Sequence, residues 1–136
     1  MQRKLRLCLE NIEETSDGYQ NISIYNTDKI VNDSCDLISI DTLEFLDAQQ
    51  SEKLLIDSIR KLRSGGYINL SFANIKKLCY QYNASMINGD VLYSALKNKN
   101  HIVDIHWLNN IIKQYNCNII NMIESDHQIS LSIQRA

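Results

Sequence analysis

The sequence predicts an α/β protein whose sheet is mostly parallel and ends in an antiparallel hairpin. In residues 36–70, an apolar strand, an amphipathic helix, a glycine pair and a second apolar strand follow one another. A helix that joins two neighbouring strands forms a crossover connection, which makes those strands parallel. The apolar stretches 118–124 and 128–134 are separated by only three residues. So short a connection predicts that these two strands are antiparallel.

Two strands are expected before the central unit. Leucines alternate with other residues from position 5 onward, which predicts a strand of about six residues. An Asp-Gly pair at 17–18 marks a turn, and residues 19–25 predict a second strand with Ile22 and Ile24 on one face. Residues 26–35 leave room for a loop and one short strand around Ile30 and Val31. No full helix fits there.

The central unit contains the clearest local signals. Leu37, Ile38 and Ile40 form an apolar run typical of a parallel strand covered on both faces. Asp47, with glutamine three residues later, predicts a capping box at the start of a helix. The predicted buried stripe of this helix consists of Leu55, Ile59 and Leu62. The glycine pair at 65–66 is expected to end the helix before a strand that begins near Tyr67.

Three helices are expected between the central unit and the hairpin. The first spans about residues 73–82, and its apolar spacing places Tyr82 in the core. A short helix follows residues 88–89. Asp104 caps a stronger helix that ends near Asn116. The apolar stripe predicted for this helix consists of Trp107, Leu108, Ile111, Ile112 and Tyr115.

Composition narrows the class of protein. A chain of 136 residues is expected to form one domain, residues 1–136. The formal net charge of −2 disfavours nucleic acid and anionic membranes as partners. No apolar run reaches the roughly 18 residues of a membrane helix, and the N-terminal apolar stretch is too short for a signal peptide. The four cysteines form no CxxC pair, so we expect free thiols and a cytoplasmic protein.

Four segments together are similar to those of a known family. They read KLRLCLEN (4–11), DGYQNISI (17–24), NDSCDLISIDTLEFL (32–46) and IRKLRSGGYINL (59–70). In this order, the chain resembles class I S-adenosylmethionine-dependent methyltransferases, in particular short ones linked to surface glycans. The resemblance covers nearly the whole chain. It implies a Rossmann-like three-layer sandwich in reduced form, with S-adenosylmethionine as cofactor and a small molecule or glycan as substrate.

The resemblance also implies a set of site residues. Cofactor contacts are expected from Cys8, Leu9, Glu10, Ser23, Asp41 and Thr42. Asp41 matches the position that faces the reacting methyl group, where it would orient a nucleophile or accept its proton. The alternative is that Asp41 only caps the loop before the helix. His101 matches a histidine near the substrate, so Asp41 and His101 are the candidate catalytic residues.

This sequence departs from the family pattern at two places. Cys8, Leu9 and Glu10 occupy a turn that is rich in glycine in the family, where a Cβ would fill cofactor space. Ser23 stands where the family has an acid for the ribose hydroxyls. A neutral hydroxyl accepts hydrogen bonds more weakly than a carboxylate, so this change is expected to weaken binding about tenfold to a hundredfold.

The sequence is compatible with three functions. The first is methyl transfer by positioned displacement, without a metal ion. The second is a non-catalytic protein with the same fold that forms a homodimer or assists an active enzyme, which the departures favour. The third is a binder of a nucleotide or another small ligand at the same cleft. The spacing of His101, Asp104 and His106 is compatible with a metal site, but helix capping is the better use of Asp104.

Overall fold

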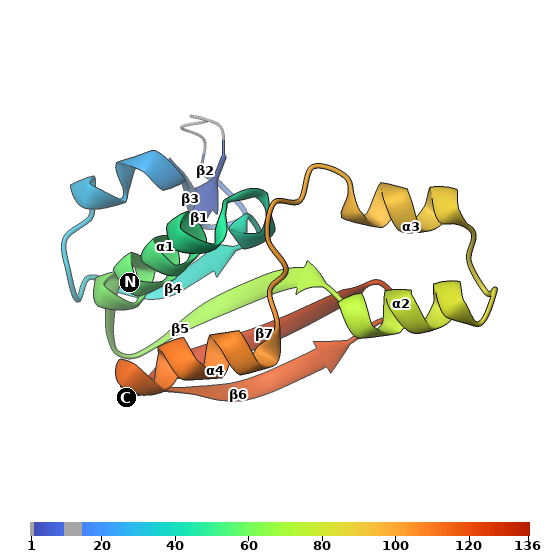
Figure 1. Cartoon of the computed structure of the whole chain (residues 1–136). Coiled ribbons are helices and arrows are strands. Elements are labelled where there is room, and N and C mark those ends of the chain that lie inside the picture. Colours follow the sequence, from blue (N-terminus) through green and yellow to red (C-terminus); the bar gives the residue numbers. More distant parts are fainter. Residues whose placement is uncertain (1, 10–14) are drawn as a thin grey trace.

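The computed structural model describes residues 2–9 and 15–136. Its strands are β1 (Lys4–Cys8), β2 (Thr15–Ser16), β3 (Tyr19–Ser23), β4 (Cys35–Ile40), β5 (Leu62–Ala73), β6 (Cys117–Glu124) and β7 (Gln128–Arg135). Its helices are the 3₁₀ helices η1 (Ile24–Lys29) and η2 (Leu43–Phe45) and the α-helices α1 (Ala48–Lys61), α2 (Ile75–Asn83), α3 (Gly89–Leu96) and α4 (Ile105–Gln114). Figure 1 shows their arrangement.

One mixed sheet organises the chain, in the order β2-β3-β1-β4-β5-β7-β6. Strand β1 lies between β3 and β4 and is parallel to both, and β4 is parallel to β5. Strand β7 is antiparallel to both β5 and β6. The predicted α/β class, the parallel centre and the C-terminal antiparallel hairpin are therefore confirmed.

The N-terminal part differs from the prediction in detail. Strand β3 ends at Ser23, and Ile24 begins the 3₁₀ helix η1 rather than continuing the strand. Within the described residues, Ile30 and Val31 form no strand. The turn at 17–18 is confirmed, since Asp17 and Gly18 both have positive φ between β2 and β3.

Helix α1 begins as predicted but ends differently. The Asp47 carboxylate accepts a hydrogen bond from the Gln50 backbone N–H at 2.8 Å, so the capping box is confirmed. The helix ends at Lys61 and passes directly into β5, so the glycine pair does not end it. Gly65 has φ of +79° inside β5. A Cβ on Gly66 would lie 3.0 Å from the Cys35 carbonyl oxygen, so close strand packing requires this glycine.

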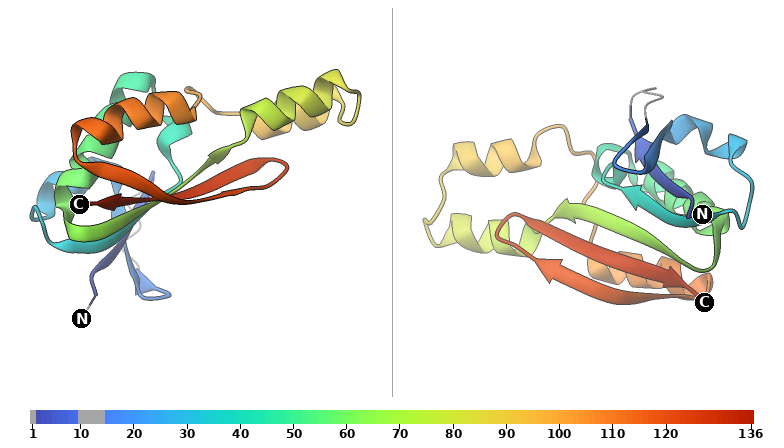
Figure 2. Two further views of the ribbon diagram at one scale, coloured as in Figure 1. Left: turned by 90° about the horizontal axis from the view of Figure 1, so that it is seen from below. Right: turned by 180° about the vertical axis from the view of Figure 1, so that it is seen from behind.

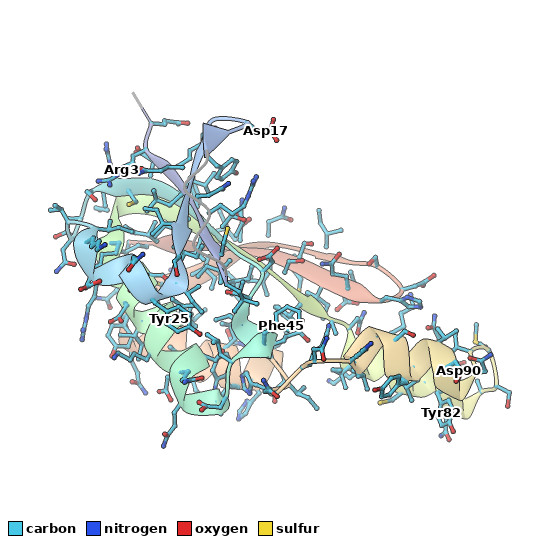
Figure 3. All side chains as sticks on the ribbon, turned by 90° about the horizontal axis from the view of Figure 1, so that it is seen from above. Arg3, Asp17, Tyr25, Phe45, Tyr82 and Asp90 are labelled. Carbon is cyan, nitrogen blue, oxygen red and sulfur yellow. The ribbon has the colours of Figure 1, made fainter. Side chains whose placement is uncertain are left out.

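The helices after β5 divide into two groups. Helices α2 and α3 extend beyond the sheet as a pair, with Tyr82 and Asp90 near its outer end (Figure 3). Tyr82 is 50% exposed, so the prediction that places it in the core is wrong. By contrast, the Asp104 carboxylate caps α4 as predicted by accepting from the Trp107 N–H at 2.8 Å. No described helix has the length and apolar character needed to cross a membrane.

The described α-helices that pack on the sheet, α1 and α4, cover only one of its faces (Figure 2). A single helical layer is thus present among the described residues, which is the reduced form of the Rossmann-like fold. The connection from β3 to β4 contains the 3₁₀ helix η1 and no α-helix. Buried apolar residues from the sheet, α1 and α4 form one core cluster on the covered face.

Small polar side chains occupy the opposite face of the sheet. They alternate with core residues along β4, β5 and β7, and include Ser39, Asn69, Ser71, Ser130, Ser132 and Gln134. The Ser132 hydroxyl donates to the Asn69 side-chain oxygen at 2.7 Å. A sheet with one apolar and one polar face is stable with water on its polar side. This composition explains how the polar face is stable without a covering α-helix from the described residues.

Candidate functional site

The carboxyl ends of three neighbouring strands bring predicted site residues together. Cys8 at the end of β1 pairs with Ser23 at the end of β3, and Leu7 pairs with Ile40 at the end of β4. Asp41 follows Ile40 directly. Burial raises the pKa of the Cys8 thiol, and the Asp41 carboxylate raises it further, against an opposing effect of Arg6. Asp41 is therefore close enough to Cys8 to act on it electrostatically.

Asp41 and Thr42 occupy this edge in different ways. Asp41 is exposed, and no hydrogen bond or ion pair holds its side chain within the described chain. Thr42 is 4% exposed, and its hydroxyl oxygen has no partner among the described residues. The helix α1 is capped by Asp47, so capping does not occupy Asp41. The Asp41 carboxylate is consequently free to interact with a bound molecule.

Ser23 is used in local structure. Its side chain is buried, with the residue only 4% exposed, and its hydroxyl oxygen accepts a hydrogen bond from the Tyr25 backbone N–H at 3.3 Å. This bond caps the first turn of η1. One acceptor site of this hydroxyl is therefore used within the protein. Glu10, the other candidate in the first turn, lies outside the described residues.

His101 belongs to a second group of residues. Its ring packs edge-on against Trp107, with 4.8 Å between the ring centroids. Its backbone N–H donates to the Glu44 carbonyl oxygen at 3.2 Å, and its Nε2 atom is buried without a partner in the described part of the chain. His101 thus contacts Glu44 in η2, whereas Cys8, Ser23 and Asp41 lie together at the carboxyl ends of β1, β3 and β4. No cluster of three His, Cys, Asp or Glu side chains suited to a metal ion occurs in residues 2–9 and 15–136.

Glu44 is a buried carboxylate beside the site, and the sequence did not predict its burial or its pairing. Its side chain is 6% exposed and forms a salt bridge with the Lys99 ammonium at 3.2 Å. The same carboxylate oxygen accepts from the Ala73 backbone N–H at 3.0 Å. Its carbonyl oxygen accepts from Asn100 at 2.7 Å and from His101. Glu44 therefore joins η2 to the end of β5 and to the segment before α4.

No local sequence pattern marks this role of Glu44. The acid falls in a short 3₁₀ helix, and its cationic partner is 55 positions away. Charged residues are rarely buried unless they are paired, so an acid inside an apolar segment such as LEFL is a weak signal by itself. The partner could not have been identified without the tertiary structure.

The electrostatic effect of Asp41 on Cys8 gives a direct prediction. In a Cys79→Ser background, which removes the exposed cysteine, Asp41→Asn is expected to increase the rate of Cys8 alkylation by iodoacetamide at pH 8. Loss of the negative charge lowers the pKa of the thiol, so more of the reactive thiolate is present. We expect an increase of roughly twofold to fivefold, measured by mass spectrometry. Asp57→Asn on α1 is the matched control, and equal rates in both variants would contradict the proximity.

Comparisons with known proteins place the fold. No family model matches the chain, and no curated protein matches its sequence. A SAM-dependent methyltransferase from Archaeoglobus fulgidus has a similar structure, with a TM-score of 0.67, 12% identity, and coverage of 98% of this chain and 86% of the other. The S-adenosylmethionine-dependent methyltransferase from Mesorhizobium loti gives a TM-score of 0.62 at 13% identity, with coverage of 98% and 90%.

A third solved structure gives the same result. It is a SAM-dependent methyltransferase from Thermotoga maritima, described as a possible histamine N-methyltransferase. Its TM-score is 0.63 at 12% identity, with coverage of 100% of this chain and 83% of the other. Identities this low establish the fold alone. The chain has the class I methyltransferase fold, as the sequence resemblance implied.

Proposed function

We propose that this protein binds S-adenosylmethionine at the carboxyl ends of β1, β3 and β4 and transfers its methyl group to an oxygen or nitrogen nucleophile. The observation that carries the proposal is the exposed Asp41 carboxylate, which lies beside Cys8 and has no partner within the described chain. In open α/β sheets, ligands bind outside the carboxyl ends of the strands. We expect a small molecule or a glycan as acceptor, as the sequence resemblance implies, and a cytoplasmic location, as the composition indicates.

The residues at this edge fit part of the cofactor. Asp41 would accept a hydrogen bond from its cationic amino group or orient the acceptor, and the unpartnered Thr42 hydroxyl would supply a further polar contact. Backbone atoms of Cys8 and Leu9 would border the same space. Ser23 would offer a ribose only a neutral hydroxyl that already accepts a hydrogen bond from Tyr25. Binding is therefore expected to be weaker than a carboxylate at position 23 would give.

In the proposed reaction the ligand supplies the reactive group and the protein positions the reactants. S-adenosylmethionine supplies an electrophilic methyl group on a sulfonium. The protein would contribute mainly by positioning, since two reactants held together avoid most of the entropic cost of their encounter. Asp41 would hold the proton of the acceptor at a carboxylate oxygen. His101 is the proposed contact to the acceptor, because its Nε2 atom has no partner in the described chain.

Calorimetry with S-adenosylhomocysteine tests the proposal. We expect a dissociation constant tighter than about 100 μM for the wild-type protein. Asp41→Ala is expected to weaken binding about tenfold to a hundredfold, because a charge-assisted hydrogen bond is lost. Asp90→Ala on α3 is the matched control, as this exposed acid lies far from the strand ends (Figure 3). Bound ligand should also protect Cys8 from alkylation.

A non-catalytic role is the second candidate, and the geometry of Ser23 favours it. In this chain Ser23 stands in place of the ribose-binding acid, and its hydroxyl is bonded to the backbone of Tyr25. Such a chain can keep the methyltransferase fold as a scaffold for association. This role predicts no heat of binding at millimolar S-adenosylmethionine and no protection of Cys8. The same two measurements therefore separate the candidates.

A further inference from the structure

Strand β6 forms one edge of the sheet. It pairs with β7 on one side, and no other described strand lies on its outer side. The opposite edge, β2, has two residues, Thr15 and Ser16. So short a strand offers little backbone for pairing, whereas β6 has eight residues. The outer N–H and C=O groups of β6 are a template for one more strand.

The side chains of β6 are unusual for an edge exposed to water. Ile120, Met122 and Ile123 are 48%, 45% and 62% exposed. The strand contains no lysine, arginine or proline, which are the residues that commonly prevent edge pairing. Its one charged residue is Glu124, at its end. The nearby charges of Lys77 and Asp126 pair with each other at 2.9 Å.

A bulge limits the part of β6 that can accept a partner. The register with β7 shifts between Ile119 and Asn121, which leaves Ile120 as the extra residue. Bulges twist an edge away from straight pairing, so the N-terminal half of β6 is the less suitable half. The segment Asn121–Glu124 continues in regular register with β7. This segment also contains two of the three exposed apolar side chains.

We propose that a second copy of this chain pairs with β6 through Asn121–Glu124, in antiparallel orientation about a two-fold axis. A two-fold axis places the same strand of each copy side by side, which meets the requirement of a closed dimer. Antiparallel self-pairing puts the two Glu124 carboxylates at opposite ends of the contact, so the only charge of the strand does not repel its own copy. The inference goes beyond the proposed function and does not depend on cofactor binding.

An apolar groove next to the end of β6 enlarges the surface available to the second copy. Its volume is about 720 Å³, and its walls include Tyr80, Ile102, Glu124 and Ile129. Tyr80 and Ile102 are 66% and 55% exposed. Stable dimers bury about 1,200 to 2,000 Å² in total, more than a four-residue strand contact provides by itself. The groove supplies apolar area that is continuous with the strand end.

Analytical ultracentrifugation of the full chain tests the dimer. We expect a concentration-dependent dimer for the wild-type protein, and Ile123→Lys is expected to raise the dissociation constant at least about tenfold, since lysine at an edge opposes pairing. Val31→Lys is the matched control, because Val31 is 69% exposed and lies outside β6, and it should leave the dimer intact. Circular dichroism and thermal melting of both variants establish that they fold.

Three results would overturn the assignment. These are a wild-type protein that stays monomeric at every concentration, a dimer that survives Ile123→Lys, or a dimer that is lost in Tyr93→Lys on α3 instead. A cysteine cross-link provides an independent measurement. In the Cys79→Ser background, Met122→Cys or Ile123→Cys, whichever residue faces its own copy across the axis, is expected to give an intermolecular disulfide under mild oxidation, whereas Val31→Cys should not. The absence of a cross-link from both Met122→Cys and Ile123→Cys in a dimeric protein would show that another surface forms the dimer.

Discussion

Lys99→Met is expected to lower the free energy of unfolding by about 2 to 4 kcal/mol. The substitution keeps the apolar stem of the side chain but removes the ammonium that lies 3.2 Å from the Glu44 carboxylate. That carboxylate is 6% exposed and would retain only the Ala73 N–H as a donor among the described residues. Loss of one partner of a buried ion pair is costly because the remaining charge stays desolvated. Urea denaturation monitored by circular dichroism measures the change.

A double variant separates the charge from other effects of the substitution. Glu44→Gln combined with Lys99→Met removes both charges, while the glutamine amide oxygen can still accept from the Ala73 N–H. We expect the double variant to be more stable than Lys99→Met alone by about 1 to 2 kcal/mol. If the double variant is the less stable of the two, the buried charge is not the cause of the loss.

Leu55→Ala is expected to destabilise the protein by about 2 to 5 kcal/mol. Leu55 is fully buried on α1 and belongs to the core cluster between the helices and the sheet. Its truncation removes apolar contacts and leaves a cavity that rigid strands on one side cannot fill. The sheet has only one helical layer among the described residues, so this core has no second apolar layer to compensate. Thermal and urea unfolding give the change in stability.

Two comparisons make the Leu55 result specific. Leu55→Met keeps the side-chain volume and is expected to cost less than about 1.5 kcal/mol. Val31→Ala truncates a residue that is 69% exposed and should change stability by no more than about 0.5 kcal/mol. A loss for Leu55→Ala no larger than that for Val31→Ala would show that α1 does not pack on the sheet as described.

Strong local signals made the centre and the end of the chain predictable. The capping box at Asp47, the cap at Asp104 and the short connection within the C-terminal hairpin each depend on residues close in sequence. Periodicity succeeded for Leu55 and Ile59 because α1 packs on the sheet. It failed for Tyr82, because α2 and α3 extend beyond the sheet and receive little cover from it. An apolar pattern identifies one face of a helix but does not establish that another element covers it.

The candidate site was predictable only in part. The strand order brings Cys8, Ser23 and Asp41 to one edge, which the parallel unit implied for Asp41 and the family resemblance for Cys8 and Ser23. The engagement of the Ser23 hydroxyl with η1 did not follow, because periodicity continued the strand through Ile24. The burial and pairing of Glu44 did not follow either, because its partners, Ala73 and Lys99, are distant along the chain. Hydrogen bonds between distant residues depend on packing that no local pattern encodes.

The sequence by itself determined the α/β class, the parallel centre, the C-terminal hairpin and the helix caps, because each results from spacing, capping or loop length within a few residues. The tertiary structure decided which face of the sheet the described helices cover, which acid is buried, and which strand edge is left open. These features arise when segments far apart in sequence compete for the same apolar surface and for the same hydrogen-bond partners. That competition is settled by the free energy of the whole fold rather than by local preference.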